Sequence, residues 1–141
     1  MPHLLHLQLG PHAPAQARSW LIATCQDLGC AALAPDAEIL VSELTTNVVL
    51  HAGTDCDVEA DYEDPVLIVT VSDGLPGELN LDAPHPDGEG GRGLLIVDAI
   101  ARAWGVTPTA TGKSVWFALW PPDLATPLRK LAIERFAGVG S

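Results

Sequence analysis

The chain has 141 residues, 48% of them hydrophobic and 18% charged, and its formal net charge is −11. These values fit one globular domain with a substantial core. The sequence shows neither a membrane span of ~20 apolar residues nor a basic signal peptide, so a cytoplasmic protein is expected. The seven Lys and Arg residues form no cluster, which excludes a nucleic-acid binder and argues against attachment to anionic lipid.

The first thirty residues predict a strand followed by a helix. Leucines alternate with polar residues over 3–9, which is typical of a half-buried strand. A helix is expected over 15–28, opened by Pro14 and capped by Gly29. Its expected buried residues are Ala17, Leu21, Thr24, Cys25 and Leu28, with Trp20 beside them.

The three cysteines are Cys25, Cys30 and Cys56, an odd number. The first two are five residues apart in one helical segment, a spacing that matches neither a zinc knuckle nor a redox pair. We expect reduced thiols in the core.

A second helix is expected from Pro35 to Ala52. At 100° per residue, one arc of this helix collects a buried face, made of Ala37, Leu40, Val41, Leu44 and Val48. Glu43, Asn47 and His51 follow one another at i, i+4 and i+8 along the edge of that face. Because burying a carboxylate is costly unless it is paired, this edge is either solvated or turned toward a ligand.

The second half of the chain predicts two strand pairs separated by a loop and a helix. Strands are expected over 54–62 and 66–72, and later over 105–111 and 113–120, the last two hinged near Gly112. A loop of about twenty residues, Asp73 to Arg92, precedes a helix from Gly93 to Trp104. A short helix or tail is expected over 123–137. The order predicts an α+β fold, a two-layer sandwich with helices on one face of a mixed sheet.

The loop carries two features that suit a nucleotide. It ends in a glycine-rich segment, 88–93, at the start of a helix, where free N–H groups and the helix dipole favour phosphate. The spacing is neither a Walker nor a dinucleotide motif, and a flexible linker is the alternative. Asp73, at a strand end, would accept a hydrogen bond from an exocyclic amine, or it simply forms a turn before Gly74.

These motifs, taken in their order, resemble the GHKL superfamily, whose members bind ATP in the Bergerat fold. The resemblance covers residues 14–120 and rests on Glu43…Asn47, Asp73-Gly74, Gly91-x-Gly93-Leu94 and the strand Gly112–Phe117. It looks closest to the anti-sigma-factor serine/threonine kinase branch, in its small stand-alone actinobacterial form. The resemblance implies an ATPase domain over residues 1–122 and a C-terminal segment over 123–141.

The resemblance also implies roles for the polar edge of the second helix. Asn47 would bind the Mg²⁺ that bridges the ATP phosphates, and Glu43 would be the general base or orient the attacking group. An amide oxygen suits Mg²⁺, which keeps several waters, and phosphoryl transfer needs mainly positioning and charge neutralisation. His51 either shapes the rim of the pocket or is satisfied by the backbone.

The remaining nucleotide contacts follow from the same resemblance. Asp73 would bind the adenine amine, and Gly77 would keep the last glycine of the Asp-x-Gly-x-Gly motif. Ser114 would replace a Thr that supports the Asp–adenine contact, directly or through water. The phosphate cradle and the hinge of a lid over 74–91 would be formed by Gly91, Arg92, Gly93 and Leu94.

Three positions depart from the superfamily pattern. Glu89 stands for the first glycine of the phosphate loop, Leu75 for the middle glycine after Asp73, and Leu50 for a basic residue that many relatives carry. These departures bear on turnover more than on nucleotide binding.

Two classes of function therefore compete. In the first, the protein binds ATP and Mg²⁺ and transfers the γ-phosphate to a Ser or Thr of a sigma factor or an anti-anti-sigma (STAS-type) protein. In the second, it is a non-catalytic module that sequesters a partner. An accessory ATPase for a histidine phosphotransfer protein ranks third. Residues 3–29 would offer a homodimer or partner surface, where Trp20 is either an anchor or core.

Overall fold

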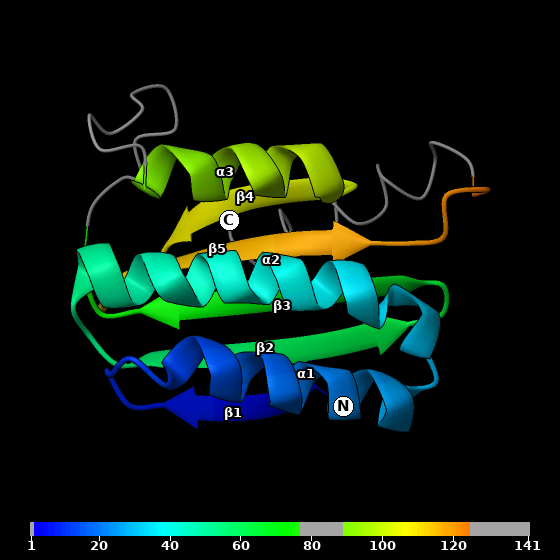
Figure 1. Ribbon diagram of the computed structural model, residues 1–141, viewed down its shortest axis with the longest axis horizontal. Helices are drawn as coiled ribbons and strands as arrows, with labels where there is room; N and C mark the ends of the chain where they lie inside the picture. The colour runs from blue at the N-terminus through cyan, green and yellow to red at the C-terminus, as the bar shows by residue number, and fades with distance from the viewer. Residues whose placement is uncertain (1, 77–88, 125–141) are drawn as a thin grey trace.

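The computed structural model describes residues 2–76 and 89–124, with the backbone alone for 89–94. This part of the chain forms three α-helices and five strands, arranged as Figure 1 shows. In chain order they are β1 (His3–Leu7), α1 (Ala13–Leu28), the 3-10 turn η1 (Ala31–Leu33), α2 (Ala34–Asn47), the π-helical turn η2 (Val48–Ala52), β2 (Cys56–Glu63), β3 (Val66–Asp73), α3 (Glu89–Ile100), β4 (Ala103–Pro108) and β5 (Lys113–Leu119).

The five strands form one sheet in the order β1-β2-β3-β5-β4, and every neighbouring pair is antiparallel. The expected mixed sheet is therefore wrong in this detail. The crossover through α3 does join two strands that run in the same direction, β3 and β4. However, β5 lies between them and pairs with both, so no parallel pair forms.

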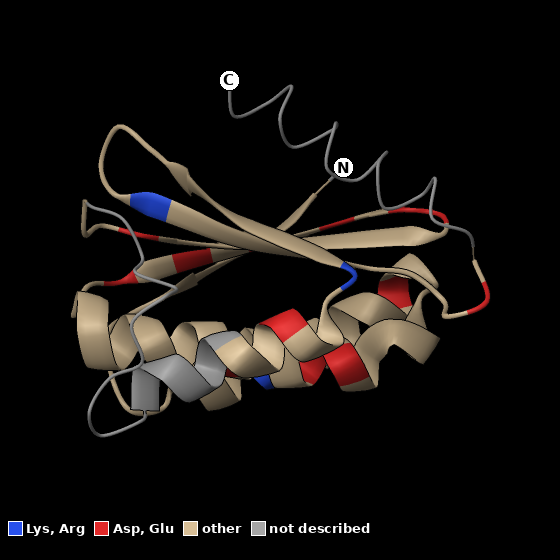
Figure 2. Cartoon of the chain, turned by 90° about the horizontal axis from the view of Figure 1, so that it is seen from above, with Lys and Arg blue, Asp and Glu red and all other residues tan. Residues whose placement is uncertain are grey.

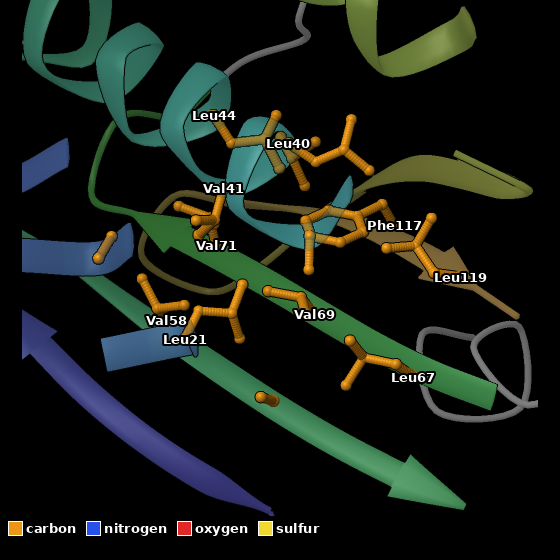
Figure 3. Close-up of a cluster of buried hydrophobic side chains, with 14 of the residues drawn as sticks. Leu21, Leu40, Val41, Leu44, Val58, Leu67, Val69, Val71, Phe117 and Leu119 are labelled. Carbon is orange, nitrogen blue, oxygen red and sulfur yellow. The ribbon is translucent and has the colours of Figure 1, made fainter. Parts of the chain in front are cut away.

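All three helices cover the same face of the sheet, as predicted (Figure 2). α1 packs over β1 and β2, whereas α2 packs over β3 and β5 and contacts α3. Leu21 and Leu40 from the helices meet Val69 and Phe117 from the central strands (Figure 3). The predicted buried face of α2 is confirmed at every position, listed as Ala37, Leu40, Val41, Leu44 and Val48.

α1 confirms its predicted boundaries closely. Gly29 ends it with a φ of 82°, a left-handed conformation that favours glycine, and the N–H of Cys30 donates to the carbonyl of Cys25 at 2.8 Å. Trp20 and Leu28 are only partly buried, but both pack against the core. All three cysteines are free thiols and buried.

α3 differs from its prediction at both ends. It begins at Glu89 rather than Gly93, so the glycine segment 90–93 belongs to the helix despite the low helix propensity of glycine. It ends at Ile100, because Arg102 N already donates to the carbonyl of Ala118 at 3.0 Å and begins the pairing of β4. Trp104, expected in the helix, lies in β4. Sheet pairing has overridden a helix-compatible sequence.

The sheet face away from the helices carries a second apolar cluster. It consists of buried side chains of β3, β4 and β5 with Leu124 packed against them, namely Val66, Ile68, Ala103, Trp116, Ala118 and Trp120. The predicted C-terminal helix or tail lies outside the described residues from position 125 on. In the part of the chain that the structure covers, no helix is both long enough and apolar enough to cross a bilayer.

Candidate functional site

Four segments that are distant in the sequence meet at one edge of the molecule. The end of α2 with η2, the end of β3, the start of β5 and the start of α3 all lie at the left side of Figure 1. The antiparallel pairing of β3 with β5 causes part of this, because it places Asp73 directly opposite Lys113. α2 adds its C-terminal end because it packs over both strands.

The polar edge of α2 is held in place by its buried side. Thr45 is fully buried, and its hydroxyl donates to the carbonyl of Val41 at 2.7 Å. Glu43 and Asn47 lie one turn apart and are partly exposed. Among the residues whose side chains the structure describes, 2–76 and 95–124, neither side chain has a hydrogen-bond or ion-pair partner. Their oxygens are thus available to a ligand.

His51 does not continue the row of Glu43 and Asn47. After Asn47 the chain turns into the π-helical η2, in which Gly53 N donates to the carbonyl of Val48 at 2.8 Å. The wider turn rotates the residues after Asn47 relative to those before it, so the predicted i+8 position is out of phase. π-helical turns inside helices occur frequently at functional sites. His51 is exposed and has an interaction of its own.

Asp73 and Lys113 form a buried ion pair at the end of β3. Lys113 Nζ lies 3.0 Å from Oδ2 and 3.2 Å from Oδ1 of Asp73, and it also donates to the carbonyl of Leu75 at 3.4 Å. The two side chains are only 4% and 9% exposed for Asp73 and Lys113 respectively. Leu75 N donates to Asp73 Oδ1 at 2.9 Å, so the turn-forming role of Asp73 is real.

Ser114 does not accompany Asp73. Its hydroxyl lies 2.6 Å from that of Ser72. Ser72 and Ser114 are paired in the sheet one position away from the Asp73–Lys113 pair. Because successive side chains of a strand point to opposite faces, Ser114 faces away from the helices. The predicted direct support of Asp73 by Ser114 is therefore not seen, and Lys113 holds that position.

The start of β5 approaches β3 very closely at Gly112. A Cβ at Gly112 would stand 2.0 Å from the carbonyl oxygen of Asp73. Thr54, just after η2, accepts a hydrogen bond on its hydroxyl from Gly74 N at 3.0 Å. The contact of Thr54 with Gly74 and the pairing of Lys113 with Asp73 were not predicted from the sequence. The alternation of side chains along β5 could have placed Lys113 from the sequence, because residue 113 must point to the same face as the apolar residues Val115 and Phe117.

The phosphate segment is only partly visible. Gly91, Arg92, Gly93 and Leu94 lie in the first two turns of α3, which begins at Glu89, and their side chains are not described. The first four N–H groups of a helix lack intrahelical partners, and these include those of Gly91 and Arg92 but not those of Gly93 and Leu94. Gly77 and most of the predicted lid lie outside the described residues. A helix N-terminus at this edge would suit phosphate.

The donor set at this edge fits a magnesium ion held together with a nucleotide. Among the described residues, no three His, Cys, Asp or Glu side chains gather as a metal cluster. Asn47 offers one amide oxygen without an internal partner, with Glu43 one turn away. Mg²⁺ commonly uses one or two protein oxygens and completes its shell with phosphate and water.

Comparisons with known proteins identify the family. The sequence model of the histidine kinase-like ATPase domain matches residues 8–119. A crystal structure of the RsbU and RsbW domains of Rv1364c from Mycobacterium tuberculosis has a TM-score of 0.65 and 18% identity, over 89% of this chain and 35% of that one. This likeness shows the same fold, and the chain spans about a third of that protein. No curated protein matches the chain. Because the family model covers most of its length, the chain belongs to the histidine kinase-like ATPase family.

Proposed function

We propose that this protein is an ATP-binding regulatory protein that transfers phosphate to a Ser or Thr of a protein partner. The observation that carries the proposal is that the ends of α2 and β3 and the start of α3 lie at one edge of the sheet (Figure 1). Glu43 and Asn47 belong to the last part of α2, and Asp73 ends β3. A bound Mg-nucleotide needs a partner for its adenine, its metal and its phosphates. Asp73 offers a carboxylate to the adenine, Asn47 an amide oxygen to the metal, and the N-terminus of α3 its N–H groups to phosphate.

Each of these residues would have a separate role in phosphoryl transfer. Asn47 would hold the Mg²⁺, which neutralises the charge of the phosphates when it is bound. Glu43, one turn away, would orient the attacking hydroxyl or accept its proton. The N–H groups of Gly91 and Arg92, in the first turn of α3, would hold phosphate oxygens, together with the charge of Arg92. Such a site acts by positioning and charge neutralisation.

The partner is proposed to be a sigma factor or an anti-anti-sigma (STAS-type) protein. The family membership supports a kinase-like regulator, and the sequence motifs look closest to the anti-sigma-factor kinase branch. The net charge of −11 favours a basic partner surface, because complementary charge steers association. The ATPase domain is proposed to span residues 1–122.

Asn47→Ala should abolish binding of Mg-ATP, whereas Glu43→Ala should bind it normally and fail to transfer phosphate. Titration calorimetry measures the first effect, and transfer of labelled phosphate to a candidate partner measures the second. Glu38→Ala is the matched control, since it removes an acid from the same helix away from the polar edge. An unchanged ATP affinity in the Asn47 variant would disprove the assignment.

The Asp73–Lys113 ion pair favours a second candidate function. A carboxylate that is already paired is a weaker acceptor for a base, and Leu75 and Glu89 depart from the superfamily pattern. The domain would then be a non-catalytic module that binds a protein partner. Partner binding without phosphate transfer, in a preparation that does bind ATP, would support this candidate over the kinase.

A further inference from the structure

We infer that Lys113 is a specificity-determining residue that competes with the nucleotide base for Asp73. In this view the ammonium of Lys113 occupies the carboxylate to which an adenine amine would donate, and so it lowers the affinity for adenine nucleotides. The inference rests on the proposed function, because it concerns the same nucleotide site. It assigns an opposing role to the neighbour of Ser114, which was the residue expected to support base binding.

The first support is the occupancy of the carboxylate. An ionised carboxylate offers about four acceptor positions. Leu75 N and Lys113 Nζ both contact Oδ1 of Asp73, at 2.9 Å and 3.2 Å, and Lys113 Nζ contacts Oδ2 at 3.0 Å. These three contacts use most of the acceptor capacity. The 6-amino group of adenine is a donor, so it must share the remaining position or displace Lys113.

The second support is burial. Both side chains are almost fully shielded from water, so the attraction between them is weakly screened. Separating a buried pair leaves an uncompensated charge, which is strongly unfavourable. The exposed contact between His6 and Asp57, in contrast, joins two side chains that are more than half exposed. An incoming base therefore meets a competitor at Asp73 that water does not weaken.

The third support is that the fold itself creates the pair. The register of β3 and β5 places Asp73 and Lys113 opposite each other on the helix-facing side. Gly112 lets the two backbones approach closely at this point. Lys113 Nζ is held further by the carbonyl of Leu75. The pair is thus part of the strand end and does not depend on a flexible surface contact.

Lys113→Met removes the ammonium while keeping an unbranched side chain, and it should tighten binding of Mg-ATP about tenfold, the effect of one hydrogen bond to a charged group. Purine riboside triphosphate lacks the 6-amino group and should bind the wild type and this variant equally. Titration calorimetry with each nucleotide measures the ratio of the variant's affinity to that of the wild type. Arg102→Met is the matched control, because Arg102 also is a cation but contacts the carbonyl of Trp120.

A double-mutant cycle tests whether the effect runs through Asp73. In an Asp73→Asn background, Lys113→Met should no longer change the affinity for ATP, since the amide does not bind the ammonium as an ion pair. This double variant also leaves no unpaired charge in the interior. Lys113→Thr also removes the ammonium but keeps a polar side chain at this position, and it provides a second uncharged variant if Lys113→Met fails to fold.

The outcomes separate the inference from the function on which it rests. If the wild type binds ATP and the Lys113 variants bind it equally or more weakly, the inference is wrong and the proposed function stands. An equal gain for ATP and for purine riboside triphosphate also overturns the inference, because the 6-amino group is then not involved. If neither the wild type nor any variant binds ATP, both proposals fail. A gain for ATP alone supports the competition.

Discussion

Gly112→Ala should destabilise the protein and weaken nucleotide binding, because Gly112 lies directly against the backbone of Asp73. The added Cβ would stand 2.0 Å from the carbonyl oxygen of Asp73, 2.8 Å from its carbonyl carbon and 2.9 Å from that of Gly74. Ordinary contact begins at 3.4 Å. To go from 2.0 Å to 3.4 Å, the turn before β5 must move away from the end of β3 by 1.4 Å.

The magnitude follows from what would have to move. Overpacking in a well-packed region costs about 1–3 kcal/mol, and here the obstacle is backbone, which has no rotamer to change. We therefore expect the upper end, about 3 kcal/mol, less roughly 0.4–1 kcal/mol gained because alanine restricts the unfolded chain. A domain of this kind is stable by about 5–15 kcal/mol, so the loss is large.

Gly105→Ala is the matched comparison. Its Cβ would meet the ring of Trp116 at 2.9–3.1 Å, and a side chain adjusts more easily than a strand. We expect a loss of about 1 kcal/mol. This substitution also lies on the sheet face away from Asp73, so nucleotide affinity should stay unchanged.

Urea unfolding followed by tryptophan fluorescence measures both variants, since Trp116 and Trp120 are buried. The midpoint should shift while the slope stays constant, which identifies a change in stability alone. Calorimetry with Mg-ATP on the folded variants measures the effect on the site. If Gly112→Ala is no less stable than Gly105→Ala, the close approach at Asp73 does not constrain the fold.

Two further predictions concern titratable groups other than the proposed site residues. Burial raises the pKa of the Cys25 thiol to about 12 and that of Cys56 to about 11, against 9.0 for an ordinary thiol. The free energy of unfolding should therefore fall as the pH rises from 9 toward 11, and urea titrations at several pH values should show a shallower fall after Cys25→Ala and Cys56→Ala. A hydrogen bond to Asp57 raises the pKa of His6 above 6.5. Asp57→Asn should lower that pKa in an NMR titration, and the stabilisation from His6 is complete below pH 6.5 and lost as the pH passes the folded pKa.

The elements predicted with most success are those whose pattern matched their burial. In α2, apolar residues recur at helical spacing, and the face they define is the one that packs on β3 and β5. In β2, predicted as a strand over 54–62, exposed and buried side chains alternate, and Cys56, Val58 and Ala60 lie in the core. Such elements are predictable because one hydrophobic face fixes both the period and the orientation.

The errors arise where pairing between distant segments of the chain determines the secondary structure or the strand order. The residues 101–104 read as a helix continuing from α3, but the backbone of Arg102 and the strand β4 bond to β5 instead. The order of the elements predicted a mixed sheet, but every neighbouring pair of strands is antiparallel. The insertion of β5 between β3 and β4 is a property of the whole topology, and no local pattern states it.

The site shows the same contrast on a smaller scale. Glu43 and Asn47 were found because helical spacing alone places them together, and the structure leaves both without an internal partner among the described residues. Ser114 was chosen by residue type, as the hydroxyl that would replace a Thr beside Asp73. The strand phase favours its neighbour, because residues 113, 115 and 117 share the helix-facing side of β5.

A lysine on the helix-facing side of β5 needs a carboxylate partner, since an unpaired ammonium in the interior is strongly unfavourable. Asp73 is the helix-facing residue that the register places directly opposite it. The alternation of β5 and the cost of a buried charge together imply the ion pair before any coordinate is measured. Strand phase, rather than residue type, therefore decides which side chain a nucleotide base would meet at Asp73.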